Sequence, residues 1–330
     1  MAENKHTKVL IIGSGPAGYT AAIYAARANL KPVQVLGLEP GGQLTITTDV
    51  ENYPGFADPI QGPWLVEQMQ AQAKHVGTEM IYDLVTDLEL TKRPFTARLD
   101  SGSTITADTI ILCTGAKARW LGLESEKQFR NMGVSACATC DGFFFKNKDV
   151  AVIGGGNSAV EEVLFLSNIC KSVTLVHRRD KLRAEKIAQD RLFGKENINV
   201  IWNSEVTEVK GIKPGEGDMP GVTGIVLKDT TNGKTSELAV DGMFVAIGHD
   251  PAVDLVKGKL ELDADGYVIT APDSTATNIP GFYAAGDVKD KLWRQAVTAA
   301  GMGCMAALEA DKFIASLEAV EHTKRAEAAE

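Results

Sequence analysis

Two cysteines lie three positions apart near the middle of the chain, at Cys137 and Cys140, and Asp141 directly follows the second. This spacing permits a small disulfide ring and lowers the pKa of a thiolate, so it favours a redox-active dithiol. Asp141 is placed to donate or accept the proton that such chemistry moves. Zinc sites use the same spacing, but no second Cys or His pair at metal spacing is present, and no metal is expected. Two unrelated buried thiols are the other alternative.

A glycine-rich turn, Gly-Ser-Gly-Pro-Ala-Gly at 13–18, lies far upstream of the dithiol. It follows an apolar, strand-like segment and begins a helical pattern, as in dinucleotide-binding βαβ units. Gly13 permits the tight turn, Gly15 lets the backbone approach a pyrophosphate, and Gly18 allows close packing of helix on strand. The helix N-terminus offers free N–H groups to the phosphates. Glu39, 21 positions after Gly18, is placed to bind a ribose 2′-hydroxyl, which predicts FAD or NAD.

A second glycine-rich turn, at 154–159, begins 14 residues after Cys140. The strand after it ends in a basic run that includes Arg178 and Arg179, where the first unit has an acidic residue. Guanidinium groups bind a 2′-phosphate bidentately, whereas a carboxylate would repel it. A solvated basic loop is the alternative, but this position in a βαβ unit favours NADP(H). The predicted NADPH contacts are Gly154, Gly155, Gly156, Asn157, Ser158, Ala159, His177, Arg178, Arg179 and Arg183.

A third motif, Gly286-Asp287, favours FAD over NAD at the first turn. A strand that ends in Gly-Asp before a helix places the carboxylate on a ribityl hydroxyl. The N-terminus of the following helix, near Arg294, is expected to face the flavin ring and stabilise negative charge on it. A simple helix cap by Asp287 is compatible with this role.

The two βαβ units begin 141 residues apart, and each starts a doubly wound domain. A β-rich stretch and a strand ending in Thr114-Gly115 complete the first unit. A segment near the C-terminus, around Gly286-Asp287, has a similar pattern and is expected to belong to the same domain. The sequence therefore predicts an α/β protein of two Rossmann-like, three-layer domains, one inserted into the other. We expect a discontinuous FAD-binding domain at 1–117 and 248–330, and an NADPH-binding domain at 118–247 that carries the dithiol. A long helix is expected from Arg294 to about Leu317.

The composition is that of an ordinary globular protein, with 330 residues, 44% hydrophobic and 23% charged. The net charge of −9 argues against nucleic acid as a partner. No apolar run approaches the roughly 20 residues of a membrane span, and the N-terminus lacks a signal core. Five cysteines with one close pair do not resemble a secreted disulfide framework. We therefore expect a cytoplasmic protein without a membrane partner.

Taken in order, these motifs resemble those of bacterial low-molecular-weight thioredoxin reductases, over nearly the whole chain from about Lys8 to Leu317. The matching words are Gly-Ser-Gly-Pro-Ala-Gly at 13–18, Gly-Gly-Gln-Leu at 41–44, Glu-Asn-Tyr-Pro-Gly at 51–55, Cys-Ala-Thr-Cys-Asp-Gly at 137–142, Gly-Gly-Gly-Asn at 154–157, His-Arg-Arg at 177–179, Ala-Ile-Gly-His at 246–249, Gly-Asp-Val at 286–288 and Arg-Gln-Ala at 294–296.

The resemblance implies a homodimer with one non-covalent FAD per subunit, in which NADPH reduces FAD, FAD reduces the disulfide, and the dithiol reduces thioredoxin. It implies that Cys140 faces the flavin, that Cys137 attacks thioredoxin, and that Asp141 is the acid/base. Together with the turn, the residues expected to bind FAD are Gly13, Ser14, Gly15, Pro16, Ala17, Gly18, Glu39, Gly41, Gly42, Gln43, Asn52, Thr114, Gly115, Gly286, Asp287, Arg294, Gln295 and Ala296.

Two other functions share parts of this pattern. The flavoprotein reductase of a peroxide-reducing system has the same core but carries an N-terminal extension with its own Cys-x-x-Cys, which is not expected here because the first unit begins by residue 9. A non-catalytic sensor that binds NADP(H) and FAD would not need the intact dithiol and Asp141.

Overall fold

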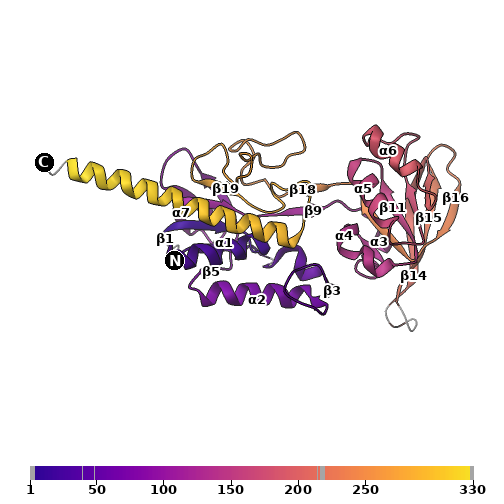
Figure 1. Cartoon of the computed structure of the whole chain (residues 1–330), viewed down its shortest axis with the longest axis horizontal. Coiled ribbons are helices and arrows are strands. Elements are labelled where there is room, and N and C mark those ends of the chain that lie inside the picture. The colour runs from indigo at the N-terminus through magenta and orange to yellow at the C-terminus, as the bar shows by residue number, and fades with distance from the viewer. Residues whose placement is uncertain (1–3, 39, 48, 214, 216–219, 328–330) are drawn as a thin grey trace. The chain divides into compact units, whose positions relative to one another are not determined.

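The computed structural model describes residues 4–38, 40–47, 49–213, 215 and 220–327. The chain divides into two compact units, one made of Met1–Lys117 and Asp250–Glu330 and the other of Ala118–His249 (Figure 1). Each unit is built on a mainly parallel sheet that is covered on both faces, which confirms the predicted α/β class of two Rossmann-like domains.

The first unit is built on a seven-stranded sheet. The order across it is β5 (Glu79–Ile81), β2 (Val33–Val35), β1 (Asn4–Ile12), β8 (Thr104–Leu112), β7 (Phe95–Leu99) and β6 (Val85–Glu89). β8 pairs antiparallel with β7 through its first half and parallel with β19 (Phe282–Ala284) through its second half. The strands from β5 to β8 are parallel to one another. β1 ends in four successive buried apolar residues, as expected for a strand covered on both faces.

Three helices cover one face of this sheet, namely α1 (Pro16–Arg27), α2 (Gly62–His75) and α7 (Ala296–Glu327). Apolar residues on the other face of the parallel strands share a core with residues of β6 and β7 and with residues between 253 and 268. Pro16 starts α1, a position where its missing N–H has no helical partner to lose. α7 runs ten residues beyond the end expected from its apolar pattern, because the alanine-rich, charged C-terminal sequence has high helix propensity.

Short elements complete the first unit and join it to the second. They are η1 (Gly42–Ile46), β3 (Asp49–Val50) and β4 (Ile60–Gln61). The chain passes between the units twice, through β9 (Ala116–Ala118) and β18 (His249–Pro251), and these two strands pair with each other.

The second unit has a five-stranded parallel sheet. Its order is β10 (Val134–Ser135), β17 (Gly242–Ala246), β11 (Asp149–Gly154), β12 (Ser172–Val176) and β13 (Ile198–Ile201). Its helices are α3 (Glu124–Gln128), α4 (Ala138–Asp141), η2 (Gly142–Phe145), α5 (Asn157–Leu166) and α6 (Lys186–Phe193). Residues of α4, α5 and α6 share a core with one face of the sheet. The antiparallel strands β14 (Ser204–Ile212), β15 (Gly221–Asp229) and β16 (Thr235–Ala239) form a separate sheet, and β14 and β15 cover the other face.

The two parallel sheets place the glycine turns in equivalent positions. The first turn follows the carboxyl end of β1 and leads into α1, and the second follows β11 and leads into α5. Ligands of open α/β sheets bind at the carboxyl ends of the strands, so each unit presents its turn where a dinucleotide would bind.

Candidate redox site and nucleotide-binding turns

The structure joins Cys137 and Cys140 in a disulfide, with their Cα atoms 5.3 Å apart. Cys137 lies just after β10 and is the residue that caps α4, so the first turn of this helix brings Cys140 back to it. The Cys140 side chain belongs to an exposed residue, whereas Cys137 is half-buried. The sequence spacing and the local helix together therefore form the disulfide without any long-range constraint.

Two donors surround the Cys137 sulfur. The backbone N–H of Cys140 donates to Cys137 Sγ over 3.2 Å, and the Thr139 hydroxyl oxygen lies 3.4 Å from the same atom. Hydrogen bonds of this kind stabilise a thiolate relative to a thiol. Cys137 is thus the sulfur better suited to carry negative charge when the disulfide is reduced.

Asp141 is a carboxyl group with an altered affinity for protons. Burial raises its pKa above the ordinary value, and a hydrogen bond with the Ser135 side chain partly opposes this shift. The Ser135 hydroxyl also accepts a 3.0 Å hydrogen bond from the Cys137 backbone N–H. Ser135 therefore links the acid to the dithiol, a role that the sequence analysis missed because a single serine before a Cys-x-x-Cys pair has no distinctive spacing.

The three glycines of the first turn meet different structural requirements. A side chain at Gly13, where φ is +113°, would lie 2.2 Å from the Cys113 carbonyl oxygen, and one at Gly18 would lie 2.3 Å from the Gly13 carbonyl oxygen. A Cβ at Gly15 would meet no atom within 4 Å. Gly13 and Gly18 therefore permit the backbone packing, while Gly15 borders open space at the start of α1, as a bound pyrophosphate requires.

Residues assigned to FAD from distant segments meet beside this turn. The Ser14 hydroxyl donates to the Leu36 carbonyl over 2.6 Å and accepts from the Gly41 N–H over 3.0 Å. A Cβ at Gly42 would lie 3.7 Å from the Gly15 Cα. Glu39, the predicted ribose ligand, lies outside the described residues.

Further along the chain, several side chains that are predicted to bind the flavin form hydrogen bonds within the first unit. Asn52 Nδ2 donates to Gln295 Oε1 over 3.3 Å, and Gln43 Nε2 donates to the Ala116 carbonyl over 2.5 Å. The Thr114 hydroxyl donates to the Ala252 carbonyl over 2.7 Å, and Gly115 follows with a φ of +74°. These contacts bring 43, 52, 114–115 and 295 into one unit around the turn.

The Gly286-Asp287 motif lies against the start of α1. A Cβ at Gly286 would be 3.0 Å from the Ala17 Cβ, so only glycine allows this approach. Burial is the main cause that raises the pKa of Asp287 to about 6, the nearby Asp290 charge adds to it, and Arg294 opposes it. Among the residues that the structure describes, no N–H or hydroxyl donates a hydrogen bond to the Asp287 carboxylate. A half-buried acceptor beside the start of α1 fits a ligand hydroxyl at this position.

Asp287→Asn is expected to stabilise the ligand-free protein at neutral pH. The folded-state pKa lies above the ordinary 3.8, so burying the ionised carboxylate lowers stability as pH rises from about 4 to about 6. Asparagine removes this penalty, which is about 2 to 3 kcal/mol. Chemical denaturation of wild type and variant at about pH 4 and about pH 7.5 measures it. A stability difference that is the same at both pH values would contradict the shifted pKa.

The imidazole ring of His177 packs against the second turn. A Cβ at Gly155 would lie 2.2 Å from the His177 ring, which is buried, and His177 Nε2 lies 2.9 Å from the Lys181 carbonyl oxygen. A Cβ at Gly156 would meet no atom within 4 Å. His177 therefore packs against Gly155 and helps to hold the turn in place, while Gly156 borders open space. Ala159, also fully buried, would lie 2.6 Å from a Cβ at Gly154.

The basic loop after β12 is anchored to this turn. The Arg183 N–H donates to the Gly155 carbonyl over 2.7 Å, and Asn157 Oδ1 accepts from the Glu185 N–H over 2.8 Å. Arg178, Arg179 and Arg183 are all exposed residues. Exposed guanidinium groups on a loop that is bonded to the turn are available to a phosphate bound there.

The remaining cysteines differ from the disulfide pair. Cys113 and Cys170 are buried, and burial raises the pKa of the Cys113 thiol and raises that of Cys170 to about 11. Cys304 is partly exposed on α7 and interacts with Tyr24. In the described part of the chain, no group of three His, Cys, Asp or Glu side chains is arranged to hold a metal ion, and none of the helices is long and apolar enough to cross a bilayer.

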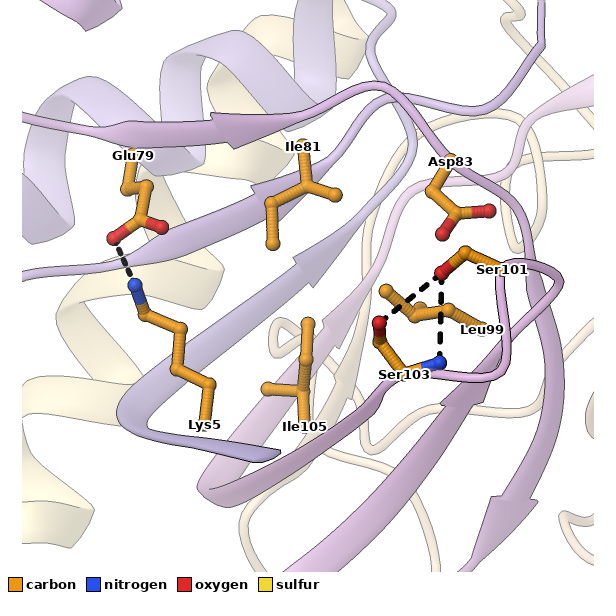
Figure 2. Close-up of a pocket in the computed structure, with 8 residues that line it drawn as sticks. All are labelled: Lys5, Glu79, Ile81, Asp83, Leu99, Ser101, Ser103 and Ile105. Atoms are coloured by element: carbon orange, nitrogen blue, oxygen red, sulfur yellow. Dashed lines mark hydrogen bonds and ion pairs between the residues drawn. The ribbon is translucent and has the colours of Figure 1, made fainter. Parts of the chain in front are cut away.

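A separate small pocket lies on the sheet of the first unit, near the amino ends of β1 and β8 (Figure 2). Lys5, which pairs with Glu79, lies on one side, Asp83 and Ser101 lie on the other, and isoleucines lie between them. It contains none of the residues predicted to bind a nucleotide, which follow the opposite ends of the strands.

Comparisons with known proteins agree with this geometry. Residues 7–303 match the family model of pyridine nucleotide-disulphide oxidoreductases. The thioredoxin reductase of Rickettsia conorii is 58% identical over 308 residues, which cover 93% of this chain and 98% of that protein. The thioredoxin reductase of Escherichia coli O157:H7 is 53% identical over 323 residues, covering 96% and 99%.

Solved structures give the same relationship. A thioredoxin reductase from Giardia duodenalis superposes with a TM-score of 0.89 at 41% identity, covering 94% of this chain and 99% of that one. One from Streptococcus pyogenes has a TM-score of 0.87 at 40% identity over the same shares. The chain therefore belongs to the pyridine nucleotide-disulphide oxidoreductase family, and within it to the thioredoxin reductases.

Proposed function

We propose that this protein is an NADPH-dependent flavoprotein that reduces the disulfide of thioredoxin. The observation that carries the proposal is the Cys137–Cys140 disulfide, with a half-buried acid beside it, in a chain with two dinucleotide turns. The names of relatives that are more than half identical over nearly the whole chain support the same activity.

FAD is the cofactor that we assign to the first turn. When bound, it would accept a hydride from NADPH and pass two electrons to the Cys137–Cys140 disulfide. The open space beside Gly15 and the half-buried Asp287 carboxylate fit its pyrophosphate and a ribityl hydroxyl. Gly13, Ser14, Gly41 and Gly42 shape the adjoining backbone. The role of Glu39 at the ribose stays a prediction.

NADPH is the electron donor that we assign to the second turn. Gly156 borders open space at the start of α5, where backbone N–H groups are free to bind a pyrophosphate. Arg178, Arg179 and Arg183 supply positive charge for the 2′-phosphate. His177 holds the loop and the turn together, and its direct contact with the nucleotide stays a prediction.

The chemistry at the sulfurs is thiol–disulfide exchange. After reduction, the Cys137 thiolate attacks one sulfur of the thioredoxin disulfide, forms a mixed disulfide and releases the other thioredoxin sulfur as a thiolate. The Cys140 thiolate then attacks Cys137 Sγ, which restores the Cys137–Cys140 disulfide and releases the second thioredoxin thiolate. Two electrons pass to thioredoxin, and both of its thiolates take up protons. The hydrogen bond from the Cys140 N–H to Cys137 Sγ supports Cys137 as the attacking sulfur.

Asp141→Asn is expected to lower turnover about a hundredfold, because the raised pKa of Asp141 favours its protonated, proton-donating form and asparagine cannot donate in this way. The variant should also lose the decline of kcat that follows deprotonation of this acid as pH rises. Steady-state kinetics over a pH series tests both effects. The matched control is Asp149→Asn, since Asp149 is a carboxylate of the same unit whose pKa is lowered by Lys171. Equal pH profiles for wild type and Asp141→Asn would exclude Asp141 as the acid.

Exposed aromatic side chains follow the dithiol directly and suit a protein partner. Phe143 is 60% exposed and Phe144 is 38% exposed, both on η2. Exposed aromatics are frequent anchors of protein interfaces. We expect Phe143→Ala to raise the KM for thioredoxin about tenfold and to leave reduction of a small disulfide reagent unchanged. Phe193→Ala, at an exposed aromatic on α6, is the control. Equal losses with both substrates would argue against docking at Phe143.

A homodimer and a cytoplasmic location stay predictions. The activity is tested with the purified protein by three measurements: flavin absorbance, anaerobic bleaching of that absorbance by NADPH, and NADPH oxidation with and without oxidised thioredoxin. We expect a bound flavin, bleaching, and thioredoxin-dependent oxidation. A protein without flavin, or with a flavin that NADPH does not bleach, would be a nucleotide sensor and not this enzyme.

A further inference from the structure

A buried carboxylate, Asp290, lies between β19 and α7, and its hydrogen bonds are not part of the sites described above. Asp290 is 5% exposed. Its Oδ1 accepts hydrogen bonds from the N–H groups of Leu292 and Trp293 over 3.0 and 2.9 Å. Its Oδ2 accepts from the Arg294 N–H over 3.1 Å. One carboxylate thus binds three consecutive backbone amides, in charge-assisted hydrogen bonds that are stronger than neutral ones.

These bonds hold a backbone conformation that the chain would not adopt freely. Arg294 has a φ of +48°, in the left-handed region that is unfavourable for residues other than glycine. Such a conformation persists only where the surrounding contacts impose it. The Arg294 side chain is also held, by a hydrogen bond to the Lys291 carbonyl and by another with the Tyr267 side chain.

Asp290 also reaches the first turn of α7. The Thr298 hydroxyl lies 3.5 Å from Asp290 Oδ2 and accepts from the Gln295 N–H over 3.3 Å. Gln295 is the residue whose side chain accepts from Asn52. The contacts therefore run from the buried carboxylate through the backbone at 292–294 to Gln295 and to Ala296, the first residue of α7.

We propose that Asp290 is a positioning residue for the flavin site: its carboxylate holds the backbone at 292–294 so that Gln295 and the start of α7 are presented to the isoalloxazine ring. This inference rests on the proposed use of FAD. The negative charge of Asp290 has a second consequence, because it lies near Asp287 and disfavours ionisation of that carboxyl.

The test compares FAD binding by flavin-free wild type, Asp290→Ala, Asp290→Asn and Asp265→Asn. Asp290→Ala removes every acceptor, and Asp290→Asn keeps one oxygen acceptor while it removes the charge. Asp265→Asn is the matched control, because Asp265 is an exposed carboxylate that pairs with Lys291 and does not bond the backbone at 292–294. The readouts are the Kd for FAD, from quenching of flavin fluorescence, and the visible circular dichroism of the bound flavin.

We expect Asp290→Ala to raise the Kd for FAD at least about tenfold and to alter the visible dichroism. Asp290→Asn should lie between Asp290→Ala and wild type, and Asp265→Asn should match wild type. If Asp290→Ala does not fold, Thr298→Val tests the same chain of contacts and should raise the Kd by about threefold. An unchanged Kd and dichroism in a folded Asp290→Ala, or in Thr298→Val where that variant replaces it, would overturn the inference.

A loss of stability alone would indicate an ordinary loop contact and would equally overturn the positioning role. Far-ultraviolet dichroism and the Tm of the flavin-free variants measure that stability independently of FAD. Failure of wild type itself to bind FAD would instead contradict the proposed function, so the two failures are distinguishable.

Discussion

Replacing Cys140 with serine is expected to lower NADPH-dependent reduction of thioredoxin at least about a hundredfold, while NADPH should still bleach the flavin. Serine preserves the size of the side chain but cannot form the disulfide with Cys137 that the structure contains. Electrons therefore reach the flavin and cannot pass to a thiol pair. Stopped-flow absorbance of the flavin measures the first step, and steady-state turnover with thioredoxin measures the whole sequence.

The matched control for Cys140→Ser is Cys304→Ser. Cys304 is a partly exposed free cysteine on α7 and forms no disulfide. The control variant should keep turnover within about twofold of wild type. If Cys140→Ser sustains normal turnover with thioredoxin, the relay through the disulfide is wrong.

Substituting Arg178 and Arg179 together by alanine is expected to raise the KM for NADPH about a hundredfold and to change the KM for NADH less than about threefold. The reason is that NADH lacks the 2′-phosphate, and each charge-assisted contact with that phosphate is worth about 1.5 to 3 kcal/mol. Both guanidinium groups belong to exposed residues that follow β12, so their removal leaves the core of the unit intact. Steady-state kinetics with the two nucleotides measures the ratio.

Arg191→Ala is the control for general loss of positive charge, since Arg191 is an exposed arginine on α6. It should shift the KM values for both nucleotides little. A double variant that weakens NADPH and NADH equally would remove the assignment of Arg178 and Arg179 to the 2′-phosphate.

Much of the site was predictable because its signals are local. Gly13 has a φ of +113°, and a side chain at Gly18 would meet the Gly13 carbonyl oxygen within the same turn, so the glycine spacing indicates the turn. The Cys137–Cys140 disulfide closes within one helical turn, and spacing again suffices. The Asp290 carboxylate accepts hydrogen bonds from backbone amides two to four residues later in the chain. This is a recognisable Asx pattern that the sequence analysis did not use.

Other features depended on contacts between segments far apart in sequence. The sequence placed His177 in a basic run, and only packing showed its ring buried beneath Gly155. The division of β8 between β7 and β19 joins segments nearly 190 residues apart, which no local pattern indicates. The raised pKa of Asp287 likewise requires burial against other elements.

The sequence by itself determined the chemistry that this protein contains: a dithiol with an acid beside it, and two turns with opposite charge after their second strands. Backbone sterics and residue spacing decide these features within a few residues. Tertiary structure alone decided which side chains are buried and how Gln295 meets Asn52. These properties depend on desolvation and on distances across the fold, and spacing along the chain does not contain them.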